Sequence, residues 1–547
     1  MPITPTYPGI YVQELLSNAH TITAAPTSVT VFVGYTHPYK TATTTFGQAV
    51  QIFSFADYQR SFGGLFSVDW LADDVGQAVN EFYLNGGSVA YVVGLQASFN
   101  DLVLKTSKPL SDPTLLPTLV VPGPGTTGIQ FTGLEPVDAN KQLTVSITNL
   151  RASIPGVTSN DLADLVISYG NVTETYRRVT PNPTPALASD AGNTLALRVG
   201  TAANPVSALV TVSTPAGDTY PTSWPFALSP TPLTITWPST NPFTTYSPGD
   251  FFNTFQADSP LDKVQIFNLL LTPGVWDLSV VSEALAFAER KRAFVIMDPP
   301  ADAGVDHSSD PLPLIGDIMS DAVPGRTIPK SQNGALYFPY LRSQDPLSGN
   351  PVTIAPSGYV AGIFTTEDTN RGVWKAPAGL ETLINDTAGV VPSGVMTDAR
   401  QGTLNPIGVN CLRGFPGVGT VIWGARTSVA ANPAFQQYRY VPVRRLALFL
   451  EQSLYQSLGW VVFEPNDTPL WVSIRSAVNG FMLGLFNQGA FAGSTPSQAF
   501  QVLCDATTTT PDDQANGIVN VLLAFAPLIP SEFVVIQIAQ LAGQPAS

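Results

Sequence analysis

Histidine and cysteine, the side chains most often used to bind transition metals or to act as nucleophiles, are rare in this sequence of 547 residues. They are far apart and show neither His-Glu-x-x-His nor Cys-x-x-Cys spacing: His20, His37, His307, Cys411 and Cys504. A zinc or non-haem iron site needs three or four converging nitrogen, sulfur or oxygen ligands. The sequence therefore predicts no metal site, and two cysteines are too few for a disulfide framework.

Three other segments could carry chemistry, and none has the full pattern that the chemistry requires. The run from His307 to Asp310 places a base beside two serines but lacks the Gly-x-Ser-x-Gly turn that holds a nucleophile. The glycines of 414–419 have neither the spacing of a dinucleotide fingerprint nor the lysine of a phosphate loop. Asp298 follows a predicted strand, where open α/β sheets bind ligands, but capping a turn or helix is the commoner role. We expect no catalytic or cofactor-binding residues and no cofactor.

Composition excludes several classes of protein. The chain is 44% hydrophobic and only 12% charged, and its 44 glycines and 49 prolines argue against a coiled coil or an all-helical bundle. A net charge of -15 argues against a nucleic-acid partner, because phosphate binding relies on clustered lysine and arginine. No stretch of about 18 uninterrupted apolar residues occurs, so we expect no direct membrane insertion. The first residues lack a basic region followed by an apolar stretch, and we expect no signal peptide.

The first part of the chain has an α/β pattern. Short Val- and Tyr-rich runs at 29–36 and 89–95 predict buried strands. Between them, apolar residues at helical spacing predict helices over 53–62 and 70–84, each followed by a Gly-Gly pair suited to a helix C-terminus. The expected unit is β-α-α-β.

The texture changes over 97–259, which contains 19 prolines and 26 threonines and no long helical period. Short apolar runs at 143–148, 195–199 and 208–213 are separated by turn residues, a pattern typical of a small β-sandwich or barrel. We therefore expect an all-β domain inserted into an α/β domain.

The α/β pattern then returns. A strand at 264–271, a helix at 277–291 and a strand at 294–297 predict a βαβ unit with parallel strands. Further strands are predicted at 335–340 and 441–443.

Two amphipathic helices are predicted near the carboxyl end. Leucines repeat every four residues from Leu446 to Leu458, and Gly459 would provide a left-handed cap. The second helix would begin with Thr468 as its N-cap before Pro469 and end before Gly489.

Both ends of the chain contain a segment of strand composition tethered by a linker of small, polar or proline residues. These segments are 9–15 and 532–540, and their linkers are 17–28 and 524–530. Such a strand can pair within its own domain or with the open sheet edge of a neighbour. Composition leaves both arrangements open.

Several motifs, occurring in order, resemble the contractile tail sheath family shared by myophages, R-type pyocins and extracellular contractile injection systems. In the amino-terminal part these motifs are Tyr7–Glu14, Thr27–Gly34, Phe55–Gly64 and Phe82–Val93. In the carboxyl-terminal part they are Arg371–Ala378, Leu404–Asn410, Val421–Thr427, Tyr440–Arg445 and Trp460–Asp467. The resemblance covers about 1–96 and 260–547 and leaves the threonine- and proline-rich segment unassigned.

This resemblance implies a non-enzymatic subunit that polymerises as stacked hexameric rings around an inner tube and contracts to drive the tube through a target envelope. Its partners would be further copies of itself, the tube protein, and baseplate and tail terminator proteins. Assembly would take place in the bacterial cytoplasm, after which the subunit would be part of a virion or injection particle. Linkers at about 16–28 and 524–531 would act as hinges. Both terminal arms would complete a small sheet in neighbouring subunits through Gly9, Ile10, Tyr11, Val12, Gln13, Glu14, Phe533, Val534, Val535, Ile536, Gln537 and Ile538.

The expected fold class is a discontinuous α/β (α+β) core with an inserted all-β domain and terminal strand-exchange arms. The segments would be an N-terminal arm and linker (1–28), a first core part (29–96), the inserted outer domain (97–259), a second core part (260–400), a C-terminal domain facing the tube (401–523), and a C-terminal linker and exchange strand (524–547). Two alternatives remain: a static phage tail or baseplate protein, and an α/β hydrolase with a β accessory domain.

Overall fold

The computed structural model describes residues 21–537 except 39, 43, 67–70, 97–115, 135–141, 171, 234–246, 301–329 and 348. Its centre is an eight-stranded sheet. In spatial order the strands are β2 (Ala49–Ile52), β3 (Ala90–Leu95), β1 (Thr30–Tyr35), β13 (Leu269–Leu271), β14 (Phe294–Met297), β15 (Gly334–Phe338), β19 (Val409–Phe415) and β20 (Gly419–Trp423). The six middle strands are parallel, and each edge strand is antiparallel to its neighbour.

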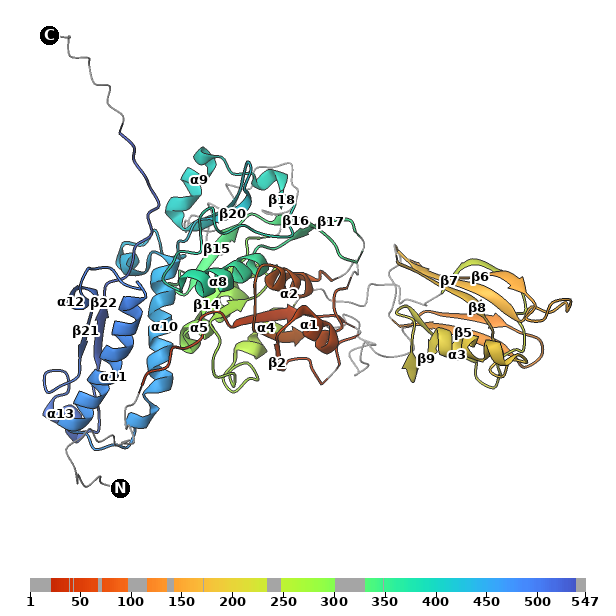
Figure 1. The fold of residues 1–547 in the computed structure, drawn as a ribbon, viewed down its shortest axis with the longest axis horizontal. Coiled ribbons are helices and arrows are strands. Elements are labelled where there is room, and N and C mark those ends of the chain that lie inside the picture. Colours follow the sequence, from red (N-terminus) through yellow and green to blue (C-terminus); the bar gives the residue numbers. More distant parts are fainter. Residues whose placement is uncertain are drawn as a thin grey trace, which may run out of the picture.

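The sheet lies between two layers of helices (Figure 1). Because side chains alternate along a strand, Val31 and Val33 of β1 pack on one face and Phe32 on the other. The first face is covered by α4 (Pro248–Phe255) and α5 (Leu278–Lys291). The second face is covered by α1 (Phe55–Phe62), α2 (Asp74–Leu84) and α8 (Ser357–Arg371).

The predicted βαβ unit is present as β13, α5 and β14, and its strands are parallel with Leu269 opposite Phe294. Asp277 caps α5 by accepting hydrogen bonds from the first-turn backbone N–H groups. The expected β-α-α-β unit is incomplete, because the short edge strand β2 also lies between β1 and the helices. Three of its four residues are not fully buried, so β2 lacks the apolar run that reveals a central strand.

Residues 116–233 form separate antiparallel sheets (Figure 1). These sheets enclose their own apolar cluster, which includes the buried Trp224. One sheet contains β4 (Thr118–Pro122), β5 (Gly128–Gly133) and β11 (Val210–Ser213), and the other contains β6 (Leu143–Arg151), β7 (Leu162–Tyr169), β8 (Val172–Val179) and β12 (Leu228–Pro232). Strands β9 (Gly200–Thr201) and β10 (Asn204–Pro205) pair with each other. The strand predicted at 195–199 is wrong: Leu195–Arg198 is the one-turn helix α3, closed by the N–H of Val199 bonding to the carbonyl of Leu195.

The two ends of the segment that holds these sheets return to the same place on the central sheet. Leu95, the last residue of β3, pairs with Tyr35 of β1. The Tyr35 hydroxyl donates to Asp250 at 2.9 Å and accepts from the backbone N–H of Ser247 at the same distance. Residues 95 and 247 are therefore brought together by one tyrosine, although about 150 residues separate them in the chain.

The carboxyl-terminal part contains two long helices and a small sheet around a fourth apolar cluster. The elements are α10 (Val441–Ser457), α11 (Thr468–Asn487), α12 (Pro496–Ala499), β21 (Phe500–Leu503), α13 (Pro511–Ala515) and β22 (Leu522–Phe525). The remaining elements are β16 (Leu341–Gln344), β17 (Pro351–Ile354), β18 (Gly389–Val390), α9 (Asp398–Leu404) and the 3₁₀ turns at 188–193, 392–394, 405–407, 433–438 and 459–461.

Three predictions for this part are wrong in detail. The strand expected at 441–443 is the first turn of α10, where Pro442 is tolerated because early helical N–H groups have no partner within the helix. Gly459 is not a left-handed cap but begins a 3₁₀ turn. The N-cap of α11 is Asp467, whose carboxylate accepts from the N–H of Leu470, and Thr468 is already helical.

Candidate functional site

The end of the chain leaves the body of the molecule as an exposed apolar segment. After β22 the chain reaches Glu532, and residues 531–537 are in neither helix nor strand. The side chains of Phe533, Val534, Val535 and Ile536 are 73, 80, 81 and 78% exposed. Figure 1 shows this segment extending away from the C-terminal helices. Four adjacent apolar side chains in solvent mark a surface that needs a partner. Gln537 follows them, whereas Gly9–Glu14 and Ile538 lie outside the described residues.

A small open sheet precedes this segment in the chain. Strands β21 and β22 form a two-stranded antiparallel sheet in which Phe500 pairs with Phe525 and Leu503 with Leu522. Within the described part of the chain, no third strand joins it. A two-stranded sheet is marginal on its own, and its outer edges present unpaired N–H and C=O groups that can accept another strand.

An ion pair fixes the point from which the exposed segment leaves. The Nε of Arg426 donates to the Glu532 carboxylate at 2.8 Å, and its Nη2 forms a second, very short contact. The Tyr440 hydroxyl donates to the same carboxylate at 3.1 Å. The third nitrogen of the guanidinium donates to the carbonyl of Asn405 at 2.9 Å. Arg426 is 2% exposed and Glu532 16%. We call Arg426, Glu532 and Tyr440 the arm clamp.

Burial and the charge of Glu532 shift the pKa values of both partners in the arm clamp, in opposite directions for Arg426 and in the same direction for Tyr440. Burial lowers the pKa of Arg426, but the hydrogen bond and charge of Glu532 outweigh it, so the net shift of the pKa is upward. Burial and the Glu532 charge both raise the pKa of Tyr440. The arginine therefore stays charged, and its buried charge depends on the carboxylate.

A cavity of about 870 Å³ lies beside the arm clamp. The segment from Leu528 to Phe533 forms one wall, and Trp374, Trp423 and Asn405 contribute to the others. The chain between β22 and Glu532 therefore borders a hollow.

The N-terminal linker is held along α10. The backbone N–H groups of Thr23 and Ala25 donate to the hydroxyls of Ser457 and Ser453, each at 3.0 Å. Residues 23–27 are thus tied to successive turns of one helix, since the carbonyl of Thr27 accepts from Arg445 at 3.0 Å.

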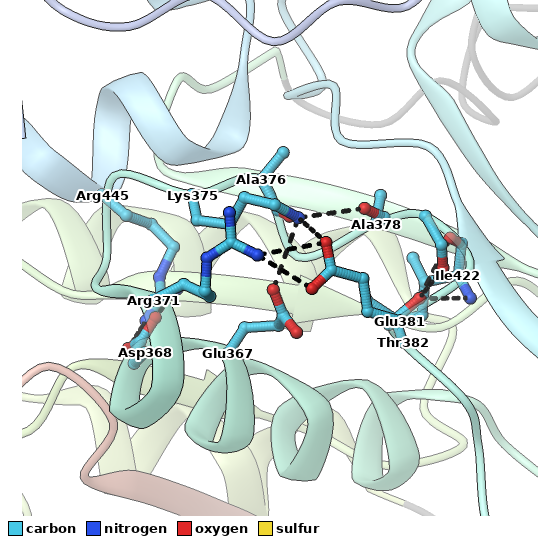
Figure 2. A network of polar contacts seen from close by, with 11 residues as sticks. Glu367, Asp368, Arg371, Lys375, Ala376, Ala378, Glu381, Thr382, Ile422 and Arg445 are labelled. Carbon is cyan, nitrogen blue, oxygen red and sulfur yellow. Dashed lines mark hydrogen bonds and ion pairs between the residues drawn. The ribbon is translucent and has the colours of Figure 1, made fainter. Parts of the chain in front are cut away.

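Arg445 also joins α10 to α8, a helix that covers the central sheet, through a buried ion pair (Figure 2). Its guanidinium makes two contacts with Asp368 of α8, at 2.8 and 2.6 Å, and both side chains are 3% exposed. The same guanidinium lies 4.7 Å from the ring centre of Phe364. The neighbouring pair in Figure 2, Arg371 with Glu381 at 3.0 Å, is about half exposed.

Lys375 links two acids in the network of Figure 2. Its ammonium lies 3.4 Å from Glu367 of α8 and 3.6 Å from Glu381. It also donates to the carbonyl of Ala376 at 3.0 Å. These contacts hold the loop after α8 against that helix.

The residues considered for catalysis have structural positions. Asp298 accepts from the N–H of Gly274 and from the N–H and hydroxyl of Ser357 at 2.7–3.0 Å, so it caps α8 and fixes the loop after β13. Burial raises its pKa to about 6. The structure also brings Asp74 close to it, a neighbour that sequence distance hides; burial and the charge of Asp298 raise the pKa of Asp74 to about 7.

The other candidates give no assembled site. Residues 414–419 span the β19–β20 turn, and both cysteines are buried thiols. His37 is buried, whereas His20 and 307–310 lie outside the described residues. Where the structure describes the chain, no three or more His, Cys, Asp or Glu side chains are grouped to hold a metal ion. None of the described helices combines the length and apolar character needed to cross a bilayer.

Comparison with known proteins identifies the class. The family model for the phage tail sheath protein central domain matches residues 262–428. The tail sheath protein of Vibrio phage KVP40 is 28% identical over 152 residues, which are 28% of this chain and 21% of that protein, so the match spans about a fifth of the relative.

Solved structures match the fold over almost the whole chain. The sheath complex of the extracellular contractile injection system PVC in its contracted state has a TM-score of 0.56 at 19% identity, covering 98% of this chain and 99% of that one. The helical sheath of the anti-feeding prophage in its contracted state has a TM-score of 0.55 at 20% identity, covering 98% and 100%. A baseplate structure of the same prophage gives 0.55 at 20% identity, covering 98% and 99%.

The fold of this chain is thus similar to that of tail sheath subunits, and its central residues match the central domain of phage tail sheath proteins. The resemblance to contractile tail sheath proteins that the motifs predicted is therefore confirmed in sequence over residues 262–428 and in fold over almost the whole chain. The sequence analysis missed the arm clamp and the Arg445–Asp368 pair. One signal for the clamp was available: Glu532 is the single charged side chain in 514–547.

Proposed function

We propose that the chain polymerises as stacked hexameric rings around an inner tube and that the resulting sheath contracts to drive the tube through a target envelope. The observation that carries this proposal is the combination of an exposed apolar C-terminal segment with an open two-stranded sheet in the same chain. Each feature alone is unfavourable in an isolated subunit. Strand exchange between copies would remove both features, because the exposed segment of one copy would pair with the open sheet edge of another.

In this proposal the two terminal arms pair with β21 and β22 of neighbouring subunits. Main-chain hydrogen bonds would supply the affinity, and alternate apolar side chains would enter the neighbour's core. The residues concerned are Gly9–Glu14 and Phe533–Ile538. The apolar cluster under β21 and β22, which includes Phe500 and Phe525, offers a surface for them.

The segments that can act as hinges are shorter than the linkers expected at 16–28 and 524–531, because parts of both linkers are hydrogen-bonded to the subunit. Residues 23–27 are hydrogen-bonded along α10, and Ala524 and Phe525 belong to β22. Backbone bonds extend this pairing to Ala526. We therefore place the pivots before Thr23 and after Glu532. Between them the subunit moves as one body, which the buried Arg445–Asp368 pair supports.

We keep the six segments expected from the sequence as proposed functional regions, with two qualifications: α4, within 97–259, packs on the central sheet, and β19 and β20, within 401–523, are strands of that sheet. The sheets of 116–233 would form the outer inserted domain, because both ends of that segment return to Tyr35. Residues 401–523 would face the tube. The subunit would assemble in the bacterial cytoplasm with its tube, baseplate and terminator partners.

Electron microscopy of the expressed chain, alone and with its tube partner, tests the proposal. We expect striated hollow cylinders from the intact chain and folded, unassembled subunits after deletion of residues 1–15 or 532–547. A stable monomer under all conditions with the tube present would contradict polymerisation, and unchanged cylinders after either deletion would contradict strand exchange.

A static tail or baseplate component is the second candidate, because one relative in fold comes from a baseplate structure. It would assemble without having a shorter, wider state. The hydrolase alternative is dropped, since both oxygens of Asp298 are engaged in capping.

A further inference from the structure

We propose that Glu532 is the positioning residue of the C-terminal arm: through the arm clamp it fixes where the arm leaves its own subunit and connects the arm to strands β15 and β19 of the eight-stranded sheet. This inference rests on the proposed strand exchange. It assigns a role to a residue that lies just before Phe533–Ile538, the residues proposed to pair with a neighbour.

Charge is unusually sparse around the arm. Glu532 is the single charged side chain among residues 514–547, and Arg475 is the last basic residue of the chain. The tail thus carries one negative charge at the boundary between a proline-containing linker and an apolar run. That charge meets a guanidinium that is 2% exposed. A buried arginine without its carboxylate is strongly unfavourable, so the pair holds the chain at this residue.

The backbone of Arg426 is hydrogen-bonded to the central sheet. The backbone N–H of Arg426 donates to the side-chain oxygen of Asn410 at 2.6 Å, and Asn410 lies within β19. The amide of Asn410 in turn donates to the carbonyls of Arg426 and Leu336, at 2.8 and 3.1 Å. Leu336 belongs to the adjacent strand β15. Arg426 is therefore fixed to two strands of the central sheet.

The surroundings of the chain change close to Glu532. Residues 528–533 border the cavity, and Leu528 and Ile529 among them are 37 and 61% exposed. Beyond them, Val534–Ile536 do not border the cavity and are 78–81% exposed. Without the clamp, the last backbone pairing before the arm would be the bridge between Phe491 and Pro527, just after β22. With the arm clamp, force that a neighbouring subunit exerts on the arm is transmitted to the central sheet through Glu532 and Arg426, and does not first separate β22 from β21.

Distance measurement between spin labels tests the positioning role in the unassembled subunit isolated by gel filtration. Labels would be placed on Val418→Cys, in the exposed turn between β19 and β20, and on Val535→Cys in the arm. Both native cysteines are buried. We expect a narrow distance distribution in the otherwise unchanged chain, loss of that narrow distribution in Glu532→Gln, and its retention in the conservative Glu532→Asp variant. Equal widths in all three chains would overturn the proposal.

A second variant covers the case in which Glu532→Gln does not fold. The pair Arg426→Met with Glu532→Leu removes both charges and leaves no buried ion. We expect this variant to fold, to lose the narrow distribution, and to give short or disordered cylinders in unlabelled samples. Ordered cylinders of normal length together with a narrow distribution would overturn the positioning role.

Deletion of residues 533–547, which retains Glu532, separates this inference from strand exchange. If the deletion leaves cylinders intact, the proposal of strand exchange by this arm is contradicted. The label distances, measured in the full-length chain, then still test the positioning role of Glu532. If it abolishes cylinders while Glu532→Gln changes neither distances nor cylinders, strand exchange stands and the positioning role fails.

Discussion

Replacing Asp368 by Asn should expose the importance of the buried ion pair that ties α10 to α8. The substitution keeps the shape of the side chain but leaves the Arg445 guanidinium without its counter-charge. Both side chains are 3% exposed, so water cannot compensate. Removing one partner of such a pair costs about 3–5 kcal/mol. At about 1.4 kcal/mol for each factor of ten, the folding equilibrium of the core should weaken by roughly three orders of magnitude.

The assay is urea unfolding of the unassembled subunit, with two controls. The exposed counterpart in the same network, Glu381→Gln opposite Arg371, should cost less than about 1 kcal/mol because solvent screens that pair. The double variant Asp368→Leu with Arg445→Met should recover most of the loss, since no buried charge remains. The β sheets of 116–233 form a separate apolar cluster, so their transition serves as an internal reference.

Two results would refute this reasoning. A loss below about 1 kcal/mol in Asp368→Asn would show that the pair is solvated like a surface ion pair. A double variant as unstable as the sum of its single variants would show that the two residues act independently. Either result would also remove the support that this pair gives to rigid-body motion of the subunit.

Two further predictions concern the core and the insert. Burial, assisted by the charge of Asp386, raises the pKa of Glu81 from its usual 4.5 to about 8. The folded state then retains a proton that the unfolded state has lost, so the free energy of unfolding should fall as the pH rises from about 4.5 to 8. The variant Glu81→Gln should flatten this fall: its urea midpoint should be higher than that of the unchanged chain at pH 8.5 and nearly the same at pH 5. An identical pH profile in both chains would contradict the assignment. Replacing residues 97–246 by a short Gly/Ser linker should leave a folded subunit that still forms cylinders, because Tyr35 brings the two junctions together. Circular dichroism would report whether the shortened chain folds, and electron microscopy whether it forms cylinders. An unfolded product would show that the core depends on the insert.

Local patterns predicted the elements that carry their own sequence signal. The strand Phe294–Met297 has the predicted bounds, and α5 begins one residue after its capping Asp277. A short apolar run is ambiguous where tertiary contacts decide its state. Val441–Val443 is compatible with a strand, but it forms the start of a helix that continues through the leucine repeat.

Contacts between distant residues could not be predicted in this way. Asp368 and Arg445 are 77 residues apart, and Arg426 and Glu532 are 106 apart. Each pair forms only when the central sheet and the C-terminal helices have packed. The family motifs did include Arg445 and Arg426, and the lone charge of Glu532 was visible, but their partners were set by the fold.

Copies of this chain are proposed to form a sheath that contracts. The most direct measurement is the length and diameter of cylinders assembled on the tube, recorded by electron microscopy before and after treatment with acid or urea. The account predicts that the cylinders become shorter and wider while staying continuous, because the exchanged arms keep neighbouring subunits connected. Cylinders that keep their dimensions until they dissociate into subunits would contradict it.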